Sequence, residues 1–358
     1  MLTKTMNPAS AASKSERFEV LDIAKGIGIF FVVFAHVNYT PILLAYIYSF
    51  HMPLFFIISG MLFNKEKYPH FSCFIKRRVK TLICPYVLFY IASLCIMFVL
   101  RCVSMGFSWP LLHDYYEYFL QMFLSQGSAK VINAPLWFVP CLFAVEIMYY
   151  FISKIKGRYN LAIIAVCSIL VFFGWLLESG YLPFDNKILP WSLDSALFAL
   201  GFYAFGNLTY GKVKYAVQKI EENKYSTLIT VTSVILCAIM LVPLVCLNGK
   251  ISLGSKVLNN GFILYASGLI GTVGIISSAV LLKKSRLLKF CGLHSFYIMA
   301  THYIIRVLYR TGCSFLSIKM YDTKSFVQTI IPFIVVMTAS IVFSILYARV
   351  KNIILNEN

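Results

Sequence analysis

Residues 20–40 read VLDIAKGIGIFFVVFAHVNYT and form the first of a series of long apolar segments. An α-helix needs about twenty residues to cross roughly 30 Å of hydrocarbon, because each residue adds only about 1.5 Å. The segment is too long for the apolar part of a signal peptide, and no small-residue cleavage site follows it. It therefore predicts a retained membrane span, in which Asp22, Lys25 and His36 need an explanation.

Similar apolar segments recur along the whole chain. Of its 358 residues, 59% are hydrophobic and only 13% are charged, whereas about a quarter of a soluble domain is charged. The bilayer is therefore the main solvent that we expect for this chain. The apolar runs predict an all-α bundle of about ten transmembrane helices, at 20–40, 43–63, 80–103, 134–153, 159–177, 189–209, 226–247, 261–282, 287–309 and 327–349.

The basic residues predict how these helices are oriented. Most of the Lys and Arg residues behind the net charge of +18 lie in short clusters on alternate loops. The positive-inside rule then places both termini in the cytoplasm, with 1–18 and 352–358 as tails and 19–351 as the membrane domain of an inner-membrane protein. Because no soluble module carries this charge, we expect no nucleic acid as a partner. Membrane lipids or a phosphorylated cofactor suit it better.

The ten cysteines are scattered singly, without a CxxC pair. Most lie within apolar segments and are interpreted as small core residues rather than as disulfide or metal ligands. Two or three histidines could in principle ligate Zn²⁺, but their spacing carries no information, and no metal is expected. The chain also lacks the G-x-S-x-G, P-loop and H-E-x-x-H motifs.

Four ionisable side chains from four segments are predicted at a similar depth in the membrane. His36 lies about 20 Å above the inner end of its segment, and His51 about 11 Å below the outer end of the next. Glu146 and His302 fall at comparable depth by the same count, and Asn38 lies near the top of the first segment. Groups that are expensive to bury and share one level favour a common polar site. A neutral imidazole there could act as general base on a hydroxyl.

Basic residues near the inner ends of the segments could bind a phosphorylated donor. Lys25 lies on the same helical face as His36. A lysine whose side chain simply extends to the cytoplasmic interface would explain its presence in this segment equally well. The loop 65–86, KEKYPHFSCFIKRRVKTLICPY, is the most basic in the chain. Positive-inside charge explains most of it, yet its cations would also suit the phosphates of a coenzyme A thioester; Arg77 and Arg78 are better candidates than the lysines, because arginine can bind phosphate in a bidentate way.

The one long outer loop, residues 104–133, contains the aromatic run HDYYEYFLQMF. It predicts an interfacial helix, or a lid in which Tyr115, Tyr116 or Tyr118 stacks on a sugar. Small residues at helical spacing predict close helix packing elsewhere; they are Ser59, Gly60, Gly268, Gly271 and Gly274.

Six segments in order resemble the acyltransferase-3 family of membrane proteins and, within it, the fucose 4-O-acetylase-like branch. They are RFEVLDIAKGIGIFFVVFAHV, YIYSFHMPLFFIISGMLF, FIKRRVKTLICPY, APLWFVPCLFAVEIMYY, SLDSALFALGFYAFG and GLHSFYIMATHYI. The family pattern of a basic residue, ten others and a histidine falls on Lys25 and His36. In two places the chain departs from the pattern: the family's arginine pair is Arg77 and Lys80 here, and GLHS brings an unusual His294.

The resemblance implies a membrane O-acetyltransferase that moves an acetyl group from acetyl-CoA to a hydroxyl of a surface polysaccharide or its lipid-linked precursor. It implies His36 as the base, with His51, Glu146 or His302 assisting. The remaining expected site residues are Lys25, Arg77, Arg78 and Lys80 for coenzyme A, and Asn38, Trp137 and Asp194 for the acceptor. The residues leave open whether acetyl transfer is direct or uses an acyl relay across the membrane.

Two other classes of protein also fit polar groups inside membrane helices. A transporter or flippase for a lipid-linked glycan would carry such groups at the midplane, and substrate movement without acetyl-CoA turnover would identify it. A sensor or scaffold would use them only as contacts between helices. It would then tolerate His36→Gln and His302→Asn.

Overall fold

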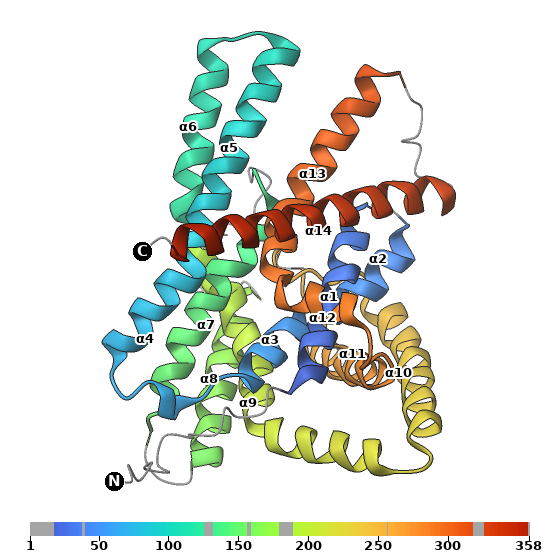
Figure 1. Cartoon of the computed structure of the whole chain (residues 1–358). Coiled ribbons are helices and arrows are strands. Elements are labelled where there is room, and N and C mark those ends of the chain that lie inside the picture. The colour runs from blue at the N-terminus through green and yellow to red at the C-terminus, as the bar shows by residue number, and fades with distance from the viewer. Residues whose placement is uncertain are drawn as a thin grey trace, which may run out of the picture.

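The computed structural model describes residues 18–37, 40–124, 132–155, 159–178, 189–255, 257–317 and 326–356. These ranges are helical and contain no β-strand, apart from an isolated antiparallel bridge between Ser252 and Val257. The α-helices, labelled in Figure 1, are α1 (Glu19–Val37), α2 (Pro41–Tyr48), α3 (His51–Met61), α4 (Phe71–Arg78), α5 (Cys84–Met105), α6 (Trp109–Leu124), α7 (Phe138–Ile152), α8 (Tyr159–Glu178), α9 (Leu193–Glu222), α10 (Ser226–Asn248), α11 (Gly261–Leu281), α12 (Arg286–Leu293), α13 (Ser295–Phe315) and α14 (Phe326–Asn356).

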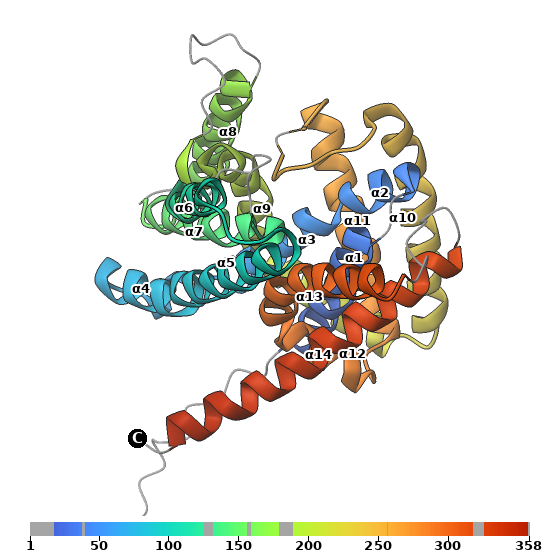
Figure 2. The same cartoon turned by 90° about the horizontal axis from the view of Figure 1, so that it is seen from above.

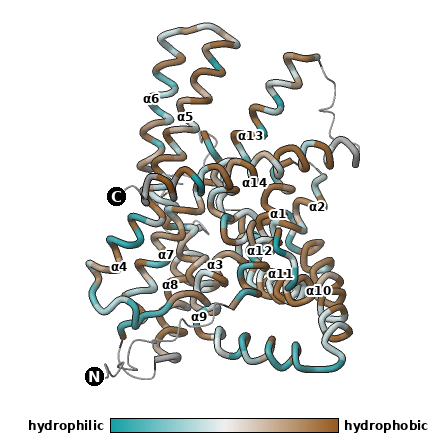
Figure 3. The backbone as a smooth tube through the Cα atoms, in the orientation of Figure 1, coloured by the Kyte–Doolittle hydropathy of each residue, from teal (hydrophilic) through white to brown (hydrophobic). Residues whose placement is uncertain are grey.

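Seven helical stretches of the described chain are long and apolar enough to cross a membrane. They are Glu19–Val37, Pro41–Met61, Phe71–Met105, Ala134–Ile152, Ser226–Asn248, Gly261–Leu281 and Thr329–Val350. The all-α multi-pass prediction is confirmed, but the number of ten spans is not. The other three predicted segments are also helical, and α8 supplies a shorter apolar stretch, Ala162–Leu176. The second half of α9 is hydrophilic (Figure 3), and His294 divides the segment 287–309 into α12 and α13.

The second predicted span is interrupted where it reaches its histidine. α2 ends at Tyr48 and α3 begins at His51, in a run predicted as one helix. Pro53 lies in the first turn of α3, where proline is tolerated because no intrahelical N–H is needed there. Its missing N–H leaves the carbonyl of Ser49 without a helical donor, and the Ser267 hydroxyl donates to that oxygen over 3.4 Å. The break places His51 at a helix start.

The third predicted span begins earlier than expected. The helical run starts at Phe71 rather than at residue 80, because the amphipathic α4 continues through a π-helical turn, Val79–Ile83, into α5. The aromatic run of the long outer loop forms α6, which packs along α5 (Figure 1). Two tyrosine hydroxyls of α5 join the pair: Tyr86 donates to the Met122 carbonyl and Tyr90 to the Tyr118 carbonyl, each over 2.8 Å.

Glycine allows a close helix crossing between α3 and α9. A Cβ atom on Gly60 would lie 1.9 Å from the carbonyl oxygen of Tyr203, and one on Gly206 would lie 2.0 Å from that of Ile57. Such contacts require glycine on both helices. The packing role predicted for Gly271 is confirmed in the same way, since a Cβ there would lie 2.2 Å from the Phe50 side chain.

The helices form two groups when seen from above. Figure 2 shows α4 to α9 on one side and α10 to α12 on the other, with α3 between them and α14 running diagonally below both groups. The first helix, α1, packs against α3, α11, α12 and α13. α1 and α3 therefore lie near the region where the two groups meet.

Candidate active site

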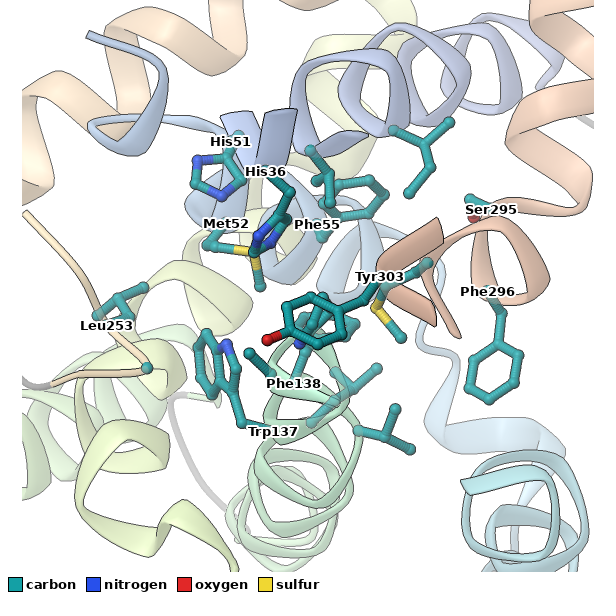
Figure 4. A pocket seen from close by; sticks show the side chains of 18 of the residues that line it. His36, His51, Met52, Phe55, Trp137, Phe138, Leu253, Ser295, Phe296 and Tyr303 are labelled. Carbon is teal, nitrogen blue, oxygen red and sulfur yellow. The ribbon is translucent and has the colours of Figure 1, made fainter. Parts of the chain in front are cut away.

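A cavity of about 630 Å³ lies between α1, α3, α7 and α13. Its volume is within the range of small-molecule sites, and apolar and aromatic side chains make up most of its wall. Figure 4 shows His36 and His51 on one side of it and the Tyr303 hydroxyl directed towards Trp137 on the other. Its polar and aromatic lining residues include Lys25, His36, Tyr48, His51, Ser59, Trp137, Ser252, Ser255, Ser295 and Tyr303.

Two histidines lie against each other at this cavity. His36 lines it from the last turn of α1, and His302 on α13 lies next to it, with ring centroids 5.0 Å apart. The Nδ1–H of the fully buried His302 donates to the carbonyl of Ile298 over 3.1 Å, since a carbonyl can only accept. Nε2 of His302 has no hydrogen-bond partner among the residues that the structure describes. As a neutral ring, His302 can therefore accept a hydrogen bond from its neighbour at Nε2.

The third histidine, His51, also carries its ring proton on Nδ1, because that nitrogen faces a backbone carbonyl. His51 lines the cavity, is 4% exposed, and its Nδ1–H donates to the carbonyl of Ile47 over 2.8 Å. Its ring edge also meets the ring of Tyr48, with centroids 4.8 Å apart. Within the described part of the chain, Nε2 of a neutral His51 makes no hydrogen bond and is available as an acceptor. The structure thus brings His36, His51 and His302 together, as their predicted depths suggested.

An arginine holds the end of α1 in place. Arg306 donates a hydrogen bond from Nη1 to the carbonyl of His36, and its guanidinium lies 4.9 Å from the centre of the Tyr303 ring. A carbonyl in the last turn of a helix has no partner of its own, and a cation there also suits the helix dipole. No sequence pattern singled out Tyr303. For Arg306 a signal existed: it follows His302 by four residues, so both side chains lie on the same face of the helix.

The opposite end of the cavity carries a lysine that is paired with a buried carboxylate. Lys25 lines the cavity and its Nζ lies 2.8 Å from Oδ1 of the buried Asp22. His36 lies eleven positions after Lys25, which is about 16 Å along α1. One cavity therefore connects an ammonium group near the start of α1 to the imidazoles near its end.

The basic segment, residues 65–86, contributes little to the cavity wall directly. Leu82 is its one lining residue, and the expected coenzyme A contacts Arg77 and Lys80 are exposed and do not line the cavity. Arg78 is turned inwards, with Nε 2.9 Å from Oε2 of Glu146, which is 3% exposed. Glu146 thus pairs with Arg78 and does not line the cavity with the histidines. Counting residues along the predicted helix gave the depth of Glu146 in the membrane, but it could not identify Arg78 as its ion-pair partner.

The three expected acceptor contacts lie in different places. Asn38 is outside the described residues, and Trp137 lines the cavity. Asp194 does not line it: the buried carboxylate accepts hydrogen bonds from the backbone N–H groups of Leu189 and Ser195, over 3.3 and 2.7 Å. An acid at the start of α9 is favourable for the helix, which gives Asp194 a structural position.

A loop between α10 and α11 closes part of the cavity, and sequence patterns did not reveal it. Residues 252–255 line the cavity, and a Cβ atom on Gly254 would lie 2.5 Å from the Trp137 ring. The Ser195 hydroxyl fixes this loop by donating to the carbonyl of Leu253 over 2.7 Å. Lys250 at its start lies over the Tyr48 ring, 5.0 Å from its centre.

His294 lies away from the cavity wall. It ends α12, donates Nδ1–H to the carbonyl of Phe290 over 3.0 Å, and stacks on the Phe290 ring with centroids 4.1 Å apart. Among the described residues, no three His, Cys, Asp or Glu side chains are grouped so that they could hold a metal ion.

Comparison with known proteins adds one match. A family model described as an acyltransferase domain matches residues 18–349, which include every residue that lines the cavity. No curated protein and no solved structure gives a significant match.

Proposed function

Since the chain belongs to the acyltransferase-3 family and is a multi-pass membrane acyltransferase, we propose that it transfers acetyl groups from acetyl-CoA to a saccharide hydroxyl. The acceptor in this proposal is a cell-surface polysaccharide or its lipid-linked precursor, as in the fucose 4-O-acetylase-like branch. The site of action is the inner cell membrane. One observation carries the proposal: Lys25 and His36 line the same cavity from the two ends of α1.

The donor enters at the Lys25 end. An ammonium group beside a partly apolar cavity attracts phosphate oxygens, and the exposed Arg77 and Lys80 add positive charge along the approach. The thioester carbonyl then extends along α1 towards the histidines. A continuous cavity over about 16 Å favours direct transfer, without a covalent acyl relay.

His36 is the general base. Its imidazole takes the proton of the acceptor hydroxyl while that oxygen forms a bond to the acyl carbon. The C–S bond then breaks, and the coenzyme A thiolate receives the proton from the imidazolium. His302, whose Nε2 has no hydrogen-bond partner among the described residues, lies beside the His36 ring and can accept the N–H of His36 as that ring takes up the proton. The apolar wall excludes water that would hydrolyse the thioester.

The experiment is acetyl transfer by the purified full chain in lipid, from labelled acetyl-CoA to extracted glycan or lipid-linked glycan. We expect an alkali-labile labelled ester with the wild type and none with His36→Ala. His70→Ala, at an exposed histidine of the basic segment, is the matched control and should keep activity. Equal labelling by wild type and His36→Ala would overturn the role of His36, and glycan movement without acetyl-CoA turnover would favour a transporter.

A further inference from the structure

A second cavity, of about 440 Å³, lies between the α5–α6 pair and α13. It shares one lining residue, Tyr303, with the cavity of the histidines. The Tyr303 ring centroid also lies 6.2 Å from that of His36. The Tyr303 side chain therefore lies between the second cavity and the proposed base.

The lining of the second cavity comes from one face of each helix. Residues 111, 114, 115 and 118 of α6 are spaced i, i+3, i+4 and i+7, and 97, 101 and 105 of α5 are four apart. The polar and aromatic members of these faces are Arg101, Asp114, Tyr115 and Tyr118.

The polar side chains of this cavity have hydrogen-bonding groups that are available to a ligand. The Asp114 carboxylate has no hydrogen-bond or ion-pair partner within the described chain, and Arg101 donates only to the sulfur of Met105, over 3.2 Å. The rings of Tyr115 and Tyr118 lie 5.4 Å apart at the same wall. Because one acid and one base line this cavity, their charges sum to zero, which suits a neutral ligand rich in hydroxyl groups.

We propose that this second cavity binds the saccharide acceptor and presents its reacting hydroxyl past Tyr303 to His36. Asp114 accepts hydrogen bonds from sugar hydroxyls, Arg101 donates to sugar oxygens, and the Tyr118 ring packs on the apolar face of the sugar. Because Lys25 and the basic segment lie at the far end of the first cavity, donor and acceptor approach the histidines from different ends. This inference rests on the proposed function and adds the acceptor subsite to it.

The kinetic test uses Asp114→Asn and Tyr118→Ala in the full chain in lipid, with extracted glycan as acceptor. We expect the KM for glycan to rise about tenfold in each variant, through the loss of a charge-assisted hydrogen bond in Asp114→Asn and of ring packing on the sugar in Tyr118→Ala. The kcat at saturating glycan and the binding of acetyl-CoA should stay unchanged. Tyr116→Ala is the matched control, since Tyr116 is 59% exposed on the same helix and does not line the cavity. Wild-type KM values in both cavity variants would overturn the proposal.

A binding measurement separates this inference from the proposed function. Calorimetric titration of extracted glycan into the wild type, without acetyl-CoA, should show binding that Asp114→Asn weakens by a similar factor and Tyr116→Ala leaves intact. If the wild type binds glycan in this way but transfers no acetyl group, the subsite stands and the proposed function fails. If glycan binding is absent, or the same in all variants, the subsite is wrong, whatever the transferase activity.

Discussion

The ring centroids of His36 and His302 lie 5.0 Å apart, with the ring planes inclined at 47°. The two residues have different surroundings: His36 faces the cavity, whereas His302 is fully buried and bonded to the helix backbone at Nδ1. A base that must change protonation benefits from a neighbour that fixes its orientation. We therefore treat His302 as a positioning residue for His36.

This division of roles predicts different kinetic losses. His36→Gln should lower kcat for acetyl transfer by about 10²- to 10⁴-fold, the usual contribution of a general base. His302→Gln should lower kcat by a smaller factor and leave KM for acetyl-CoA and glycan unchanged, because it disturbs orientation rather than binding. Steady-state kinetics with both substrates measures the two parameters. A normal kcat for His36→Gln would contradict the assignment of the base.

Lys25 is expected to act on the donor alone. Lys25→Gln should raise KM for acetyl-CoA about tenfold, the loss of one charge-assisted hydrogen bond, and leave KM for glycan unchanged. Lys25→Arg keeps the charge and should retain most of the affinity. An equal rise of KM for both substrates would show that Lys25 supports the cavity instead of binding the donor. Lys283→Gln, at a surface ion pair with Glu221, is the control.

The Arg78–Glu146 pair predicts a stability effect. Glu146→Gln leaves a largely buried guanidinium without its counter-charge, which should lower the free energy of unfolding by about 3–5 kcal/mol. The double variant Arg78→Met with Glu146→Leu removes both charges and should recover most of that loss. Thermal unfolding in detergent compares the three proteins. Additive losses in the double variant would show that the two side chains are not coupled.

The α3–α9 crossing predicts opposite effects at two glycines of one helix. Gly206→Ala forces a Cβ against the Ile57 carbonyl and should destabilise the protein by about 1–3 kcal/mol. Gly211→Ala, five residues along α9, meets no atom within 4 Å and should stabilise it by about 0.5–1 kcal/mol. The midpoints of thermal unfolding should shift in opposite directions. A neutral Gly206→Ala would mean that the helices do not cross so closely.

Much of the architecture follows from local sequence. Apolar runs of about twenty residues must be helices in a bilayer, because each backbone polar group needs a partner inside its own segment. The helical segments therefore agree with the structure, including the run Ala134–Ile152. The helix start at Phe71 was missed, because an amphipathic start depends on only a few residues. The break before His51 lies within a run that was predicted as one helix, beside a proline.

The candidate site was predictable in part for a similar reason. Histidines inside apolar helices stand out in the sequence, and counting residues along a helix gives their depth. The same count cannot give direction or neighbours. Glu146 has the expected level but pairs with Arg78, and Asp194 lies at the start of α9. The loop around Gly254 has no sequence pattern that would have predicted its place at the cavity.

The sequence by itself determined that the chain is a helical membrane protein, which residues are expensive to bury, and the family to which it belongs. Each of these depends on composition and spacing within one segment. Only the tertiary structure decided that His36 meets His302, that Lys25 lines the same cavity, and that Tyr303 separates two cavities. The physical reason is that helix rotation and crossing are set by packing between segments, where a glycine or a single ion pair selects the neighbour.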